Sequence, residues 1–285
     1  MSKIETVPLP KDERGNDPND YRGDPAFVAK LTPQKARANL AWTSQFRISD
    51  KEAEEMADPD FIFDDLVIKG HLILVVSEPN GGKTTIMMWL AGELARANHV
   101  IYVNADVSGG DAKRMVSEAE AKGFELLLPD MKAGLSMSDV VLNLEEMNQS
   151  DADLSGIVFV FDTLKKMTDV INKSKAKSLL KTLRGLSAKG ATVICLAHTN
   201  KYSDAEGNPI YEGTGDLRSD VDELIYLIPK KNDDGSMTVS TQPDKVRGEF
   251  RPITFGISPD RGVSLSEFVD VAEIKQAESQ REKDE

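Results

Sequence analysis

The chain has 285 residues, with 35 basic and 48 acidic side chains and a net charge of −13 when His is neutral. A chain of this length buries roughly 75% of its unfolded surface and folds without disulfides. Its one cysteine, Cys195, has no cysteine partner. No apolar run approaches the ~18 residues of a membrane helix, and the polar N-terminus is not a secretory signal. We expect a cytoplasmic protein with no membrane partner, and the acidic total argues against a protein that coats nucleic acid.

The charge is unevenly distributed along the chain. Residues 162–201, called the basic segment below, carry nine basic residues against two acidic ones, a net charge of +7, which leaves −20 for the rest. The basic members are Lys165, Lys166, Lys173, Lys175, Lys177, Lys181, Arg184, Lys189 and Lys201. This segment is either a solvated helix face or a local surface for an anionic partner.

The first 57 residues differ in composition from the rest. Residues 1–25 are rich in Pro, Asp, Asn and Gly and have little to bury, which predicts a disordered or loosely held arm. Residues 26–57 are predicted to form one or two helices that pack on their own core or on a neighbouring subunit. Their apolar anchors are Leu31, Ala36, Leu40, Trp42 and Phe46.

From Phe61 onward, apolar strands alternate with helices. The predicted strands cover residues 71–77, 100–106, 156–162 and 191–198, and the predicted helices cover 84–99, 111–122 and 174–189. Nearly continuous apolar strands that alternate with helices predict an α/β fold, with a mainly parallel central sheet flanked by helices.

The C-terminal side is β-rich. Strands are predicted at 223–229, 237–241 and 252–257, and Asn-Asp-Asp-Gly at 232–235 predicts a hairpin turn between the first two. We expect three regions: an N-terminal arm with helices over 1–57 that is a candidate subunit-contact segment, a main domain over 58–262, and a charged tail over 263–285.

The strongest chemical signal lies between the first predicted strand and its helix. The phosphate loop (residues 77–84) is close to the pattern of Gly, four residues, Gly-Lys-Ser/Thr. Backbone N–H groups of such a loop and the positive end of the helix hold the phosphates of ATP. Lys83 is expected to contact the β- and γ-phosphates, and the Thr84 hydroxyl to bind Mg²⁺. The alternative is a structural Gly-rich turn. The expected nucleotide contacts are Ser77, Glu78, Pro79, Asn80, Gly81, Gly82, Lys83, Thr84 and Thr85.

One position of the loop departs from the pattern, because Ser77 stands where Gly is usual. A left-handed backbone angle there would cost a Ser roughly 1–2 kcal/mol. Gly81 and Gly82 remain where the backbone comes closest to phosphate, and Asn80 accepts left-handed angles better than most residues. We therefore expect the loop to tolerate Ser77.

Three further polar residues end predicted strands. Asp162 is expected to hold Mg²⁺ through water. Asp106 is expected to orient and deprotonate the attacking water, with Asp111 as the alternative base. His198 is expected to sense the γ-phosphate. For each of them, the alternative is an ordinary turn, cap or structural role.

Together these residues resemble the RecA-like ATPases, and among them the hexameric replicative helicases of the plasmid RepA and DnaB type. The phosphate loop is specific by itself, whereas the other similarities gain weight from their order along residues 61–257. The similar stretches are residues 66–72, 102–106, 159–163, 197–201, 213–220 and 245–248.

The resemblance implies a subunit that contributes to its neighbour's site. The family's Lys-x-Arg before a Gly supplies a cation pair to ATP bound by the adjacent subunit, and Lys245 and Arg247 match it. This implies a homo-oligomeric ring, expected to be a hexamer. Family members usually have Glu as catalytic base, where this chain has the shorter Asp106, so hydrolysis is expected to be slow or to use another base. The alternative for Lys245 and Arg247 is a solvated strand-edge pair.

The resemblance also implies a DNA channel. Loops after the Asp162 and His198 strands face the centre of the ring in this family, and here they are residues 165–177 and 201–218. Lysines in a channel bind a phosphate backbone without reading sequence, and Tyr202 or Tyr211 is a candidate for stacking on a base. The expected DNA contacts are Lys165, Lys166, Lys173, Lys175, Lys177, Lys201 and Arg218.

These residues favour an ATP-hydrolysing, ring-forming, helicase-like DNA motor for replication or recombination that uses ATP and Mg²⁺ and binds single-stranded DNA. The resemblance to a compact, stand-alone ATPase of this kind also suits a phage- or plasmid-encoded protein. Three alternatives remain open. They are a RecA-like recombinase or mediator that does not unwind DNA, a nucleotide-switched assembly factor that binds no DNA, and a small-molecule phosphotransferase.

Overall fold

The computed structural model describes residues 23–26, 41–54, 60–64, 66–203, 209–213 and 216–274, so the predicted N-terminal arm lies almost entirely outside the described part. The chain divides into two compact units, Met1–Ala57 and Asp58–Glu285. In the first unit, the described part includes η2 (Ala41–Phe46) and α2 (Asp50–Glu54). The rings of Trp42 and Phe46 meet edge to face at 5.8 Å, and both side chains are exposed.

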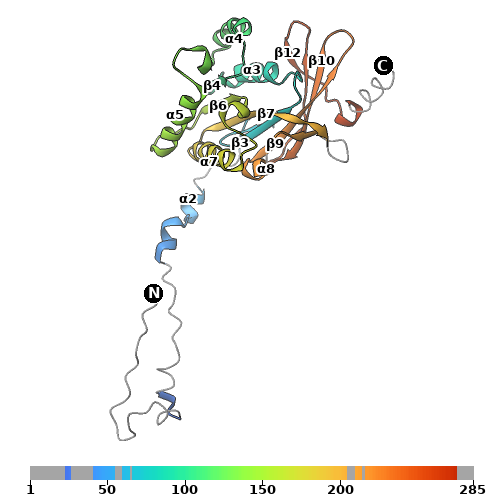
Figure 1. Cartoon of the computed structure of the whole chain (residues 1–285). Helices are drawn as coiled ribbons and strands as arrows, with labels where there is room; N and C mark the ends of the chain where they lie inside the picture. The colour runs from blue at the N-terminus through green and yellow to red at the C-terminus, as the bar shows by residue number, and fades with distance from the viewer. Residues whose placement is uncertain are drawn as a thin grey trace. The chain divides into compact units, whose positions relative to one another are not determined.

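The second unit is built on one large sheet (Figure 1). Its strand order is β12-β11-β10-β9-β3-β7-β6-β4-β5, and β8 pairs with β7. The neighbours from β9 to β5 run parallel, whereas β9 to β12 pair antiparallel. This confirms the predicted α/β fold with a mainly parallel sheet and a hairpin extension on the C-terminal side. The strands are β3 (Leu72–Ser77), β4 (His99–Asn104), β5 (Glu125–Leu127), β6 (Ile157–Asp162), β7 (Thr192–Ser203), β8 (Pro209–Tyr211), β9 (Glu223–Lys231), β10 (Met237–Lys245), β11 (Thr254–Ile257) and β12 (Val263–Ser266). A separate pair joins β1 (Phe61–Phe63) to β2 (Val67–Ile68).

Helices cover both faces of the sheet (Figure 1). Helices α3 and α4 lie over one face, and α5, α7 and α8 lie over the other. The helices are α3 (Lys83–Leu94), α4 (Gly109–Lys122), η3 (Pro129–Met131), α5 (Met137–Gln149), α6 (Leu164–Met167), α7 (Lys173–Ala188) and α8 (Asp216–Asp220).

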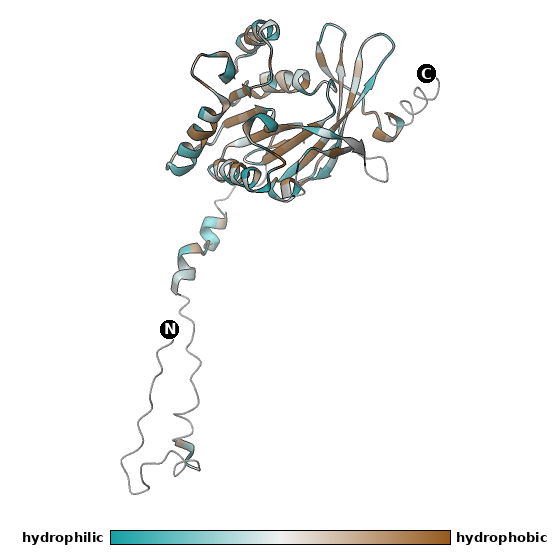
Figure 2. Ribbon diagram, viewed as in Figure 1, coloured by the Kyte–Doolittle hydropathy of each residue, from teal (hydrophilic) through white to brown (hydrophobic). Residues whose placement is uncertain are grey.

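The alternation of side chains along each strand divides the core in two. Leu72 and Leu74 pack toward α5 and α7, whereas Ile73 and Val75 pack toward α3. All six residues of β3 are buried, which explains why its sequence is uniformly apolar up to Ser77. Figure 2 shows the resulting concentration of hydrophobic residues in the central strands.

The predicted hairpin joins β9 to β10, and Gly235 has the left-handed φ of 81° that this turn requires. The sheet continues into the region expected as a charged tail, because β12 pairs with β11. Ile274 is fully buried in the core on the α7 side of the sheet. Residues 275–285 lie outside the described part.

Candidate active site

The ends of neighbouring strands bring the predicted catalytic residues to one edge of the sheet. Ser77 at the end of β3 is level with His198 on β7, and Asn104 at the end of β4 is level with Asp162 at the end of β6. Asp106 follows Asn104 by two residues. Because parallel strands end at the same edge, residues far apart in the sequence share one site there.

The phosphate loop enters α3 through two left-handed residues, Asn80 with φ 63° and Gly82 with φ 80°. Gly82 favours glycine because of its left-handed φ, and a Cβ there would also require the end of the Ile257 side chain to move. Ser77 ends β3 as an ordinary strand residue, so the backbone strain considered for it does not arise. Its hydroxyl is buried, with no hydrogen-bond partner among the described residues.

Lys83 is the first residue of α3 and is 5% exposed. Its Nζ donates to the Ala197 carbonyl at 2.9 Å and lies 3.3 Å from Nδ1 of His198. Since an ammonium only donates, Nδ1 is the acceptor and the imidazole proton sits on Nε2. Burial and the Lys83 charge lower the pKa of His198, which favours this neutral form. These two partners of Lys83 are neutral, so neither holds the ammonium in an ion pair that an anionic ligand would have to break.

Burial lowers the pKa of Lys83 to about 8, against the opposing attraction of Asp162 and Asp106. A phosphate group held by Lys83 needs the ammonium form, so above pH 8 the binding of such a group must be accompanied by proton uptake. We expect the Kd for ATP to weaken by up to about tenfold per pH unit above that value, as linkage to one proton requires. Titration calorimetry in buffers of different ionisation enthalpy measures the Kd for ATP and the number of protons taken up on binding.

Weaker ATP binding above pH 8 would not come from unfolding linked to Lys83. The pKa of Lys83 is lower in the native chain than its ordinary 10.5, so the unfolded chain binds more protons between about pH 8 and 10.5. Stability contributed by this group therefore rises with pH over that window. A Kd for ATP that stays constant from about pH 7 to about pH 9.5 would contradict the assignment of Lys83 to the phosphate site.

Asp162 gathers three donors on one carboxylate oxygen. Its Oδ2 accepts from Thr84 Oγ1 at 2.7 Å, Tyr102 OH at 2.9 Å and Asn104 Nδ2 at 3.2 Å. The side chain is buried, and burial raises the pKa of Asp162 while the hydrogen bonds and Lys83 oppose the rise. The predicted metal-binding pair, Thr84 and Asp162, is therefore in direct contact.

Tyr102 and Asn104 were missed by the sequence analysis. They stand two residues apart on β4, so their side chains point to the same face, beside the strand that ends in Asp162. A polar residue and a tyrosine at alternate positions of an otherwise apolar strand were the available signal.

Asp106 lies in the loop that follows β4, and its backbone is tied to the site. Its N–H donates to Asn104 Oδ1 at 2.8 Å, and the same Asn104 side chain donates to Asp162. The Asp106 carboxylate acts electrostatically on Lys83 and His198. Its Oδ1 also lies 3.0 Å from Nζ of Lys166, a residue expected to contact DNA. The alternative base, Asp111, lies in the first turn of α4.

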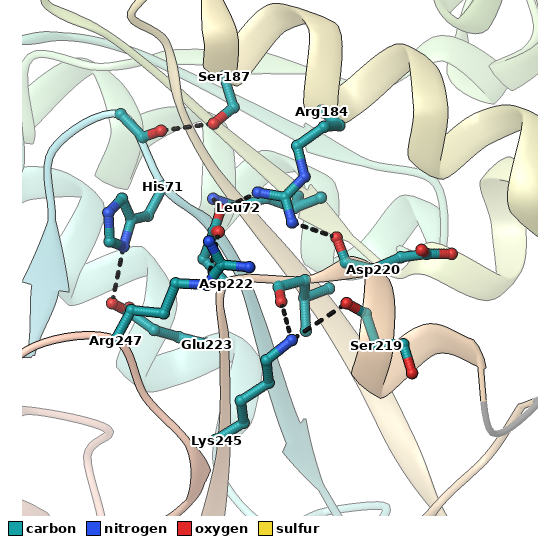
Figure 3. A network of polar contacts seen from close by, with 12 residues as sticks. His71, Leu72, Arg184, Ser187, Ser219, Asp220, Asp222, Glu223, Lys245 and Arg247 are labelled. Atoms are coloured by element: carbon teal, nitrogen blue, oxygen red, sulfur yellow. Dashed lines mark hydrogen bonds and ion pairs between the residues drawn. The ribbon is translucent and has the colours of Figure 1, made fainter. Parts of the chain in front are cut away.

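Lys245 and Arg247 lie at the opposite end of the strands (Figure 3). Arg247 Nε is 3.3 Å from Oδ1 of the buried Asp222, whose backbone and side chain both bond Leu72 at the start of β3. The phosphate loop follows the other end of β3, five residues along and so roughly 17 Å away. The structure therefore does not bring this pair to the phosphate loop of its own subunit.

Figure 3 shows further contacts around this pair. Arg247 shares Asp222 with Arg184 of α7. Lys245 Nζ donates to three carbonyls at the end of α8, those of Arg218, Ser219 and Val221. Lys245 thereby satisfies carbonyls that the carboxyl end of a helix leaves unpaired, although burial and the neighbouring Arg247 lower the pKa of Lys245.

The expected DNA contacts with described side chains lie on three helices. Lys165 and Lys166 lie on α6 beside the site, and Lys165 Nζ is 2.7 Å from Glu212. Three exposed lysines occupy the first two turns of α7: Lys173, Lys175 and Lys177. Arg218 lies on α8, where it pairs with Asp244 at 2.6 Å.

The remaining residues predicted to contact DNA are the two tyrosines proposed for base stacking and Lys201. Tyr211 packs into the core and is 9% exposed, so it offers little ring surface for a base. Lys201 and Tyr202 lie on β7, but their side chains lie outside the described part. Within the described residues, no helix has both the length and the apolar character of a membrane span.

Neither a family model nor a curated protein sequence matches the chain. Among solved structures, the chain is similar to the flagellar accessory protein FlaH from Methanocaldococcus jannaschii, with 16% identity and a TM-score of 0.48. The match covers 70% of this chain and 91% of that chain. A likeness at this level carries no information about activity.

Proposed function

We propose that the chain is a RecA-like ATPase that binds ATP with Mg²⁺ and hydrolyses it. The observation that carries this proposal is the convergence of Lys83, Thr84, Asp162 and Asp106 at the mouth of the phosphate loop. A structural Gly-rich turn has no need of a buried lysine or of a buried carboxylate bonded to the Thr that follows it.

The chain's residues have distinct roles in this proposal. Loop N–H groups and the amino end of α3 hold the phosphates. Thr84 would bind Mg²⁺ directly and Asp162 would bind it through water, and the bound ion would neutralise negative charge on the phosphates. Tyr102 and Asn104 fix the Asp162 carboxylate, as the outer partners of metal-site residues commonly do. Asp106 orients the attacking water and accepts its proton.

The proposal includes a homo-oligomeric ring. Arg247 supports it by position, because it is partly exposed and lies at the sheet edge away from its own phosphate loop. Its expected use is therefore on ATP held by a neighbouring subunit, where an Arg neutralises charge on the transferring phosphoryl group.

The proposal assigns single-stranded DNA to the basic segment. Lys173 and Lys175 place cations in the first turn of α7, where the helix dipole disfavours positive charge by roughly 0.3–1 kcal/mol per group, and Lys177 follows in the next turn. A bound phosphate backbone would offset this unfavourable placement, so the pattern supports an anionic partner. The acidic remainder of the chain disfavours DNA elsewhere on the surface.

The test measures ATPase rate and binding of an oligothymidylate, each at several salt concentrations. If about four lysines neutralise phosphates, we expect a slope of log K against log salt of about −3. Replacing Lys173, Lys175 and Lys177 together with Ala should reduce that slope by about 2, while Lys132→Ala, at an exposed turn elsewhere, should leave it unchanged.

An ATPase with neither DNA stimulation nor salt-dependent DNA binding would contradict the DNA assignment. The strongly acidic remainder of the chain would then favour the second candidate, a nucleotide-switched assembly factor whose partners are proteins.

A further inference from the structure

We propose that Lys166 restrains the catalytic base in the DNA-free protein, so that DNA binding releases Asp106 for hydrolysis. The inference rests on the proposed function and adds its regulation. The observation behind it is the 3.0 Å ion pair between Lys166 Nζ and Asp106 Oδ1. One partner belongs to the expected DNA contacts and the other to the ATP site.

The geometry makes this pair a link between two fixed loops. Lys166 follows β6 on α6, which is anchored by the buried Leu164. Asp106 follows β4, and its backbone is anchored by the Asn104 side chain. β4 and β6 are neighbouring parallel strands, so the two loops leave the same edge side by side. Only the two side chains need to move for the pair to break.

The chemistry gives the pair its effect. A carboxylate that accepts a water proton needs a free oxygen directed at that water. With Lys166 on Oδ1, the Asp106 carboxylate is turned toward α6 and one of its two oxygens is occupied. A DNA phosphate competes for the same ammonium, and a bound phosphate leaves Asp106 free to turn toward the site.

The solvent exposure of the two side chains limits how much the Lys166–Asp106 ion pair can change the rate of hydrolysis. The side chains of Lys166 and Asp106 are 46% and 50% exposed, so solvent screens the pair. Half-exposed ion pairs contribute at most ~1 kcal/mol, which corresponds to about a fivefold change in rate. Lys166 is thus a positioning residue that tunes the DNA dependence of hydrolysis, and it leaves the chemical step to Asp106.

The main experiment measures kcat and KM for ATP with and without saturating oligothymidylate. For Lys166→Met, we expect the DNA-free kcat to rise about two- to fivefold, with the KM for ATP and the DNA-saturated kcat unchanged, so the stimulation by DNA shrinks. Lys166→Arg keeps a cation beside Asp106 and should retain the wild-type stimulation. Lys132→Met is the matched control at an exposed position and should leave both rates unchanged.

A reciprocal measurement does not depend on turnover. Because coupling between two sites is mutual, Asp106→Asn should free Lys166 and tighten oligothymidylate binding by a similar two- to fivefold factor, measured by fluorescence anisotropy. The same substitution in a Lys166→Met background should then have no effect on DNA affinity.

Each outcome has a separate meaning. A DNA-free rate of Lys166→Met that is unchanged or lower than wild type overturns the restraint. If wild-type protein hydrolyses ATP but binds no DNA, the DNA assignment fails, and the DNA-free rate still decides whether Lys166 restrains Asp106. If it binds DNA without hydrolysing ATP, the affinity of Asp106→Asn decides. A chain that does neither overturns both proposals.

Discussion

Replacing Lys83 with Ala is expected to lower kcat/KM for ATP hydrolysis by at least about a hundredfold, the loss typical when one preorganised donor to a developing charge is removed. Lys83 is buried at the start of α3, and its ammonium is directed at the strand end where the phosphates are proposed to lie. An exposed lysine elsewhere on the surface cannot compensate for the loss of Lys83, because solvent screens its charge and its position is not fixed. A coupled phosphate-release assay measures the loss.

Folding must be separated from catalysis in this variant, because Lys83→Ala leaves the Ala197 carbonyl without its lysine donor. Unfolding by urea should show a modest change in stability, of about 1–3 kcal/mol, with a native far-UV spectrum at low denaturant. Arg96→Ala, just beyond the other end of α3, removes an exposed ion pair with Glu93 and should leave turnover unchanged. Turnover by Lys83→Ala within about tenfold of wild type would refute the active-site assignment.

The central strands were predictable because burial on both faces requires an uninterrupted apolar run. β3 and β6 match this rule within one residue at each end. The hairpin turn was predictable from Asn-Asp-Asp-Gly at 232–235, because Gly235 readily takes the left-handed φ found there. Asp162 could be singled out because it ends the apolar run of β6 downstream of the phosphate loop. The predicted end of the next strand at His198 was wrong, because β7 continues to Ser203 through polar residues that give no apolar signal.

Other elements lacked such a signal. β5 is three residues long at the sheet edge and β12 has no fully buried residue, so neither carries an apolar run. The 13-residue helix α5 was not predicted either, although Ser136 and Asp139 form a capping box at its start.

The ion pairs of Lys166 and Arg247 could not be predicted from the sequence either. Lys166 is 60 residues from Asp106, and Arg247 is 25 residues from Asp222. Pairings of this kind depend on which strands become neighbours, and strand order is a property of the folded sheet that no local pattern encodes.

Replacing Arg247 with Ala is expected to lower kcat by about a thousandfold, the lower end of the range for an arginine finger, while the Kd for ATP changes by less than about twofold. The two effects separate because Arg247 lies at the sheet edge opposite its own phosphate loop, so it cannot hold the ATP of its own subunit there. Stability should fall by less than ~1 kcal/mol, since the buried Asp222 keeps Arg184 and the Leu72 N–H, and the Arg247 side chain is itself half exposed. Arg114→Ala, which breaks an exposed pair with Glu118, is the matched control.

Mixing two inactive subunits tests whether the arginine acts across an interface. Arg247→Ala subunits keep an intact Asp162 site, and Asp162→Asn subunits keep Arg247, so a head-to-tail interface between them can combine both functional halves. After random co-assembly, about a quarter of the interfaces in a closed ring pair an intact site with an intact Arg247, and the mixture should recover up to about that fraction of wild-type turnover. Activity that stays at the level of the two separate variants, once co-assembly is verified by a tag on one of them, would place Arg247 outside the reaction. The contacts it makes with Asp222 would then be its whole role, that of the solvated strand-edge cation which the sequence left as the alternative.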